Sequence, residues 1–193
     1  MISNISSKLA IVMYKNNNKQ IADIEVYKYG LELMISSIVN MLVMIGLSLA
    51  LSCFKEAILY ILFFAILRIS AGGYHASTHF KCLLLYSLIM FPIIRFIEIL
   101  KVGLNSHFVL LVCCVSIFCV FRYAPVDSEN KPLNKKEYYL FKKSSRNTVL
   151  IQSTILILLV LLINDIFIYI LSCSAGMFVE SITLLPILNR RRS

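Results

Sequence analysis

Residues 56–100 read EAILYILFFAILRISAGGYHASTHFKCLLLYSLIMFPIIRFIEIL, which is two apolar runs joined by a polar stretch. That stretch, RISAGGYHASTHFKC, covers residues 68–82 and holds a glycine pair, two histidines and a cysteine. Glycines permit a tight bend or a close approach of the backbone to a ligand. A cysteine near a histidine supplies a nucleophile and a base. The pattern therefore predicts apolar helices on both sides of a reactive turn.

The composition predicts an all-α integral membrane protein. Of 193 residues, 59% are hydrophobic and only 15% are charged, and the mean hydropathy is +0.82. A soluble domain of this size could not bury that much apolar surface. A full span needs about 20 apolar residues, and the second of the six apolar segments is the shortest, so whether it crosses completely stays open. The segments are 31–54, 56–70, 81–100, 106–122, 148–164 and 166–188.

The N-terminal segment, residues 1–30, precedes these spans. Over residues 1–15, apolar side chains recur on one helical face, which predicts an amphipathic helix. Such a helix would lie in the membrane interface or pack on the protein's own cytoplasmic face.

The charge distribution predicts the orientation of the spans. Of the 19 Lys and Arg residues, all but Lys55, Arg95 and Lys101 fall in the N-terminal segment, the 68–81 turn, a loop over 122–147 or the tail 189–193. By the positive-inside rule, these four regions are cytoplasmic. The positive charge is thus assigned to topology and to anionic lipid of the bilayer, not to nucleic acid.

The reactive turn leaves three interpretations open. His75 lies seven residues before Cys82, about 10.5 Å away along a straight helix, so a catalytic pair requires a bend or a loop leading into a helix whose first turn holds Cys82. His79, three residues before Cys82, is the rival base. Alternatively, the i, i+4, i+7 spacing of the three residues could bind zinc, or the segment could be a structural polar turn.

Two motifs carry a resemblance to a known family. The first is R-x-x-x-G-G-x-H-A with a cysteine seven residues after the histidine, and the second is YAPVDSENKP over residues 123–132. Together they resemble the accessory gene regulator protein B (AgrB) family, which are bacterial membrane cysteine endopeptidases. The resemblance covers nearly the whole chain.

The resemblance implies an enzyme with catalytic His75 and Cys82 and no metal or cofactor. It would cleave a precursor peptide and cyclise it, through a thioester on Cys82, to a (thio)lactone quorum-sensing signal. Residues 31–188 would form the multi-pass peptidase domain in the bacterial plasma membrane, with the active site in the cytoplasm. The rival class is a small peptide transporter or channel without protease activity, which should tolerate the loss of Cys82.

Several further residues are site candidates. We expect Arg68, Gly72 and Gly73 to support the site, although Arg68 could instead stabilise an oxyanion, bind a substrate carboxylate or snorkel to the interface. The basic loop offers candidate substrate contacts, and its residues Asp127, Glu129 and Asn130 could also orient His75. The candidate contacts are Asp127, Glu129, Asn130, Lys131, Lys135 and Lys136.

The apolar segments also contain polar groups. Arg95 and Glu98 are spaced as an i, i+3 ion pair inside the bundle beside Pro92. Glu180 is an intramembrane acid, for which either a functional role or a partner on another helix is expected. The small pair Ser172 and Gly176 predicts close helix packing, within one copy or between two copies in a homodimer.

The orientation can be tested with reporter fusions. We expect reporters placed after Lys19, near Ser77, near Lys136 and after Arg192 to report the cytoplasm, and reporters at Lys55 and Asn105 to report the outside, because cations are retained inside. An external signal from the fusion near Ser77 would contradict a cytoplasmic active site.

Overall fold

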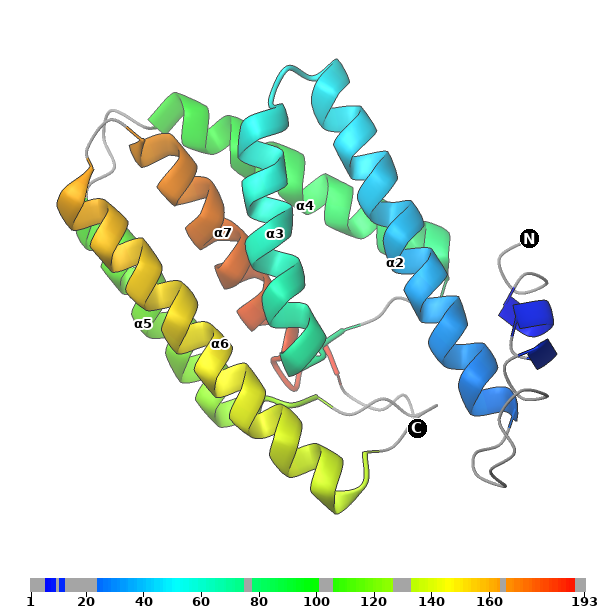
Figure 1. The fold of residues 1–193 in the computed structure, drawn as a ribbon. Coiled ribbons are helices and arrows are strands. Elements are labelled where there is room, and N and C mark those ends of the chain that lie inside the picture. Colours follow the sequence, from blue (N-terminus) through cyan, green and yellow to red (C-terminus); the bar gives the residue numbers. More distant parts are fainter. Residues whose placement is uncertain are drawn as a thin grey trace.

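The computed structural model describes residues 6–9, 11–12, 24–74, 78–100, 106–126, 133–163 and 166–189. Within these ranges the chain forms helices and no strand, which confirms the all-α prediction. Six long helices run back and forth (Figure 1). They are α2 (Ile24–Ala50), α3 (Phe54–Ala71), α4 (His79–Leu100), α5 (Ser106–Tyr123), α6 (Lys135–Leu162) and α7 (Phe167–Thr183).

Each predicted apolar segment corresponds to one of these helices. Four of them contain stretches long and apolar enough to cross a membrane, namely Gly30–Ala50, Phe80–Ile99, Ser106–Tyr123 and Lys135–Leu162. Much of the apolar surface of these four helices faces outward, with Leu88 69% and Leu162 77% exposed. Side chains of this kind are stable on the outside only when lipid surrounds the helix. The arrangement is therefore that of a membrane protein.

The helices α3 and α7 form the centre of the bundle. In α7, which has 17 residues, most side chains are buried, and it packs against α3, α5, α6 and α4. Gly176 of α7 lies against the backbone of Tyr60 in α3, where an added Cβ would come within 3.0 Å of the Tyr60 carbonyl carbon. Of the two packing roles predicted for the small pair, the structure thus shows the one within a single copy.

The helix α6 begins earlier than the sequence predicted. Residues 135–147, expected to belong to a loop over 122–147, form its first turns. A capping box starts it: the Asn134 side chain accepts a hydrogen bond from the Glu137 amide (2.9 Å), and the Glu137 carboxylate accepts one from the Asn134 amide (3.0 Å). These two bonds satisfy backbone donors that would otherwise be unpaired, which favours the helix.

The length of α6 explains where the basic residues lie. Its 28 residues span about 42 Å, longer than the roughly 30 Å hydrocarbon core of a bilayer. Figure 1 shows its N-terminal end extending beyond the neighbouring end of α5. Lys135 and Lys136 lie exposed in this first turn.

Two other predictions concern the N-terminal segment and the ion pair in α4. The N-terminal residues 6–9 and 11–12 are helical, with Leu9, Ile11 and Val12 exposed. Arg95 and Glu98 form the predicted ion pair at 2.7 Å, but their side chains are 48% and 26% exposed, so the pair is not internal.

The start of α6 can be tested by hydrogen exchange. Replacing Asn134 with Ala removes the cap, which should destabilise the start of α6 by about 1 kcal/mol. Exchange of the Glu137 amide should therefore become about five-fold faster. Asn134→Asp keeps an acceptor and should behave like the wild type. Equal exchange in the two variants would mean that Asn134 does not cap a helix at this position.

Candidate active site

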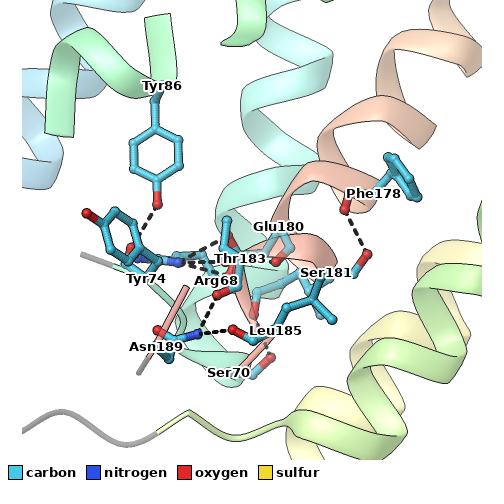
Figure 2. Close-up of polar contacts among 11 residues, drawn as sticks. Arg68, Ser70, Tyr74, Tyr86, Phe178, Glu180, Ser181, Thr183, Leu185 and Asn189 are labelled. Atoms are coloured by element: carbon cyan, nitrogen blue, oxygen red, sulfur yellow. Dashed lines mark hydrogen bonds and ion pairs between the residues drawn. The ribbon is translucent and has the colours of Figure 1, made fainter. Parts of the chain in front are cut away.

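The site is organised around Arg68, near the C-terminal end of α3. Its side chain is only 14% exposed and reaches the last turn of α7 (Figure 2). There, Nη1 lies 3.3 Å from both carboxylate oxygens of Glu180, which is fully buried, and donates to Thr183 Oγ1 at 3.0 Å. Because a buried charge is tolerated only when it is paired, this contact joins α3 to α7.

The other arm of the same guanidinium holds the backbone of Tyr74. Arg68 Nη2 donates to the Tyr74 carbonyl oxygen, which also accepts from Tyr86 Oη of α4 at 2.9 Å. The Tyr74 amide donates to the Thr183 carbonyl at 3.2 Å. Groups from α3, α4 and α7 therefore converge on Tyr74 (Figure 2), the residue directly before His75.

Both glycines of the motif are required by their surroundings. Gly72 and Gly73 have φ values of 72° and 126°, a region that side chains disfavour. A Cβ on Gly72 would lie 2.5 Å from the Val126 carbonyl oxygen, and one on Gly73 would collide with Arg68 Nη1 and Thr183 Oγ1. The glycines thus make the turn and also leave room for the Arg68 contacts.

Cys82 lies at the start of α4. Thr78 begins this helix: its hydroxyl accepts from the Lys81 amide at 3.2 Å, and its carbonyl accepts from the Cys82 amide at 3.0 Å. Cys82 is half-buried and lies one helical turn before Tyr86, so the two share a face of α4. It is also close enough to Arg68 for their charges to interact. The first turn of α4 therefore holds Cys82, as a catalytic pair with His75 would require.

The remaining thiols have different surroundings. Of the other cysteines, Cys53, Cys113, Cys119 and Cys173 are buried, and Cys114 is exposed on α5. Buried thiols in apolar surroundings are usually inert. Cys82 is therefore distinguished by its place beside the converging polar groups.

The second motif reaches the first through its described end. The Val126 amide donates to the Ala71 carbonyl at 2.9 Å, so the chain after α5 lies against the glycine turn. Several predicted residues lie outside the described ranges, namely His75, Asp127, Glu129, Asn130 and Lys131. Lys135 and Lys136 are described, on α6.

No three His, Cys, Asp or Glu side chains gather as metal ligands among the described residues. Two of the three ligands of the zinc interpretation, His75 and His79, have side chains outside that description.

Three groups of the site were not assigned to it from the sequence. Thr183 and Tyr86 carried no signal, because their residue types and spacing are ordinary for apolar helices. Glu180 did carry one, as an acid in an apolar segment, and its partner Arg68 is the basic residue of another apolar segment. Intramembrane charges commonly pair with one another.

The chain is similar to known proteins along nearly its whole length. The sequence model of the family described as Accessory gene regulator B matches residues 6–184. The chain belongs to the accessory gene regulator B family. Both motifs and all the site groups described above lie within the matched region.

Curated relatives are similar over most of their length. Accessory gene regulator protein B of Staphylococcus aureus (strain MRSA252) is 26% identical over 180 residues, which are 93% of this chain and 92% of the relative. Putative AgrB-like protein 2 of Clostridium perfringens (strain 13 / Type A) is 27% identical over 168 residues, 84% and 78% of the two chains. No solved structure matches the chain significantly.

The glycine turn predicts opposite effects for two similar substitutions. Gly73→Ala should lower the thermal unfolding temperature in detergent, because a side chain at φ 126° is strained by about 1–3 kcal/mol and would displace Arg68. Gly30→Ala, in α2, meets nothing within 4 Å and should leave the temperature unchanged or raise it, since Ala favours helix. Equal temperatures for both variants would contradict the described turn.

Proposed function

We propose that this protein is a membrane cysteine endopeptidase that cleaves a precursor signal peptide and cyclises it through a thioester on Cys82. The observation that carries the proposal is the link between Cys82 and the residue before His75. Tyr86, one turn after Cys82 on the same helix face, donates to the Tyr74 carbonyl at 2.9 Å. His75, the proposed base, is the next residue of the chain after Tyr74. Family membership supports the same assignment.

The surroundings of Cys82 suit a nucleophile. A helix N-terminus and a nearby cation both favour the thiolate over the thiol. Cys82 has both, since it lies in the first turns of α4 and within electrostatic reach of Arg68. His75 would be the base that completes the activation.

The reaction has two steps. In the first, Cys82 Sγ attacks the carbonyl carbon of the scissile peptide bond, and the C–N bond breaks as His75 passes the thiol proton to the leaving amine. In the second, a cysteine thiol of the precursor attacks the resulting thioester, closes a thiolactone and releases Cys82. One thioester replaces another, so the ring closes without ATP.

The basic start of α6 suits the substrate. Lys135 and Lys136 are exposed there, on the side of the membrane that the positive-inside rule assigns to the cytoplasm. An acidic segment of the precursor, held at the same membrane surface, would be attracted to them within a Debye length of about 8–10 Å. These lysines would hold the substrate, while Cys82 and His75 would carry the chemistry.

The proposal is tested with the precursor peptide that we expect to be encoded beside the gene for this protein, in vesicles that contain the purified enzyme. Cys82→Ala should abolish cleavage and His75→Ala should reduce its rate by orders of magnitude, because one removes the nucleophile and the other the base. When the cysteine of the precursor is replaced by Ala, the thioester on Cys82 should accumulate and be visible by mass spectrometry.

Matched variants provide the controls. Cys114→Ala removes another accessible thiol, and His79→Ala removes the rival base; both should retain most of the activity, as should the wild type in excess EDTA. Wild-type cleavage by Cys82→Ala would refute the proposal. Sensitivity to EDTA, with equal losses from the two histidine variants, would favour a zinc hydrolase.

A further inference from the structure

Glu180 has no part in the proposed chemistry, yet its carboxylate is fully buried in the last turns of α7. Both of its oxygens lie 3.3 Å from Arg68 Nη1. Thr183, three residues later, accepts from the same nitrogen at 3.0 Å and donates to the Glu180 carbonyl at 2.8 Å. The guanidinium is thus held by an acid and a hydroxyl of one helix turn.

These contacts at Nη1 determine the orientation of the rest of the guanidinium. The group is planar and rigid, with its donors in a fixed fork, so fixing Nη1 also fixes Nη2. Nη2 donates to the Tyr74 carbonyl. The other backbone group of Tyr74, its amide, donates to Thr183 of the same α7 turn. The end of α7 therefore holds Tyr74 directly at the amide and, through Arg68, at the carbonyl.

The Tyr74 carbonyl is also the point where α4 enters the network. Tyr86 donates to it at 2.9 Å, and the Arg68 guanidinium lies 5.9 Å from the Tyr86 ring. Cys82 is one turn away on α4, and His75 is the next residue of the chain after Tyr74. Displacement of the carbonyl would change the separation of these two residues.

We propose that Glu180 is a positioning residue: by holding Arg68 it fixes Tyr74, and so sets the geometry between His75 and Cys82. The inference rests on the proposed function of those two residues. Glu180 touches Arg68 and Thr183 and is fully buried, so it acts through Arg68 and not on the substrate.

Stability alone does not account for this ion pair. Replacing a buried pair by apolar side chains of similar volume is often neutral or stabilising, because the desolvation cost disappears. What such a replacement would remove is the Nη2 contact with Tyr74. Positioning and stability can therefore be separated by experiment.

The experiment measures kcat and KM for precursor cleavage by Glu180→Gln, which keeps the shape of the side chain but loses its charge. Misplacement of a reacting group by about 1 Å costs on the order of 10²-fold in rate, so we expect kcat to fall by about that factor with KM changed less than about two-fold. A substrate-independent readout accompanies it. Alkylation of Cys82 by iodoacetamide, followed by mass spectrometry at neutral pH, should also be slower than in the wild type.

Glu98→Gln is the matched control. It removes the acid of the other ion pair, 2.7 Å from Arg95 on the part of α4 far from Cys82, and it should leave kcat and Cys82 alkylation unchanged. The double variant Arg68→Met with Glu180→Met covers the case in which Glu180→Gln does not fold. This double variant should unfold at the wild-type temperature or higher. Its kcat should nevertheless be as low as that of Glu180→Gln, or lower.

The outcomes are distinct. A wild-type kcat in folded Glu180→Gln, or losses equal to those of Glu98→Gln, would overturn the positioning role. So would a double variant that is both stable and fully active. Failure of the proposed function gives a different result, since Cys82→Ala would then still cleave the precursor.

Discussion

The ion pair between Arg68 and Glu180 is the contact on which the arrangement of the site depends. In an apolar medium each of these charges alone would cost several kcal/mol, about as much as the net stability of many domains. Paired at 3.3 Å, with Thr183 as a further acceptor, they tolerate burial. The pairing then ties the end of α3 to the end of α7, although 112 positions separate the two residues.

Around this contact the bundle divides into a core and a lipid-facing shell. The core is α3 and α7, which approach so closely that Gly176 leaves no room for a side chain against Tyr60. The shell consists of helices that present leucine and other apolar side chains outward. The glycine turn lies at the C-terminal end of α3.

Hydropathy and charge made the helices predictable, but they did not predict where every helix begins and ends. Apolar runs mark where lipid contacts the chain, so each of the six corresponds to a helix. The first turns of α6 were missed because they are basic and polar, and hydropathy does not register a helix outside the membrane. A signal was nevertheless present, since Asn134 and Glu137 have the spacing of a capping box.

The site was predictable only as far as its residues are neighbours in sequence. Arg68, the glycines and Cys82 stand within one short stretch, and the structure gathers them. The contribution of α7 could not be read from spacing, because it depends on which helices become neighbours after folding.

Backbone hydrogen bonding explains why such distant groups meet at Tyr74. Where the backbone leaves α3 at Gly72, it no longer satisfies its own hydrogen bonds, and backbone groups inside a protein need other partners. For Tyr74 these partners come from Arg68, Tyr86 and Thr183. Each of these partners also restricts how the chain can move. The need to pair the backbone groups released at the end of α3 therefore immobilises Tyr74, and the proposed pair of His75 and Cys82 would need that rigidity to hold its geometry.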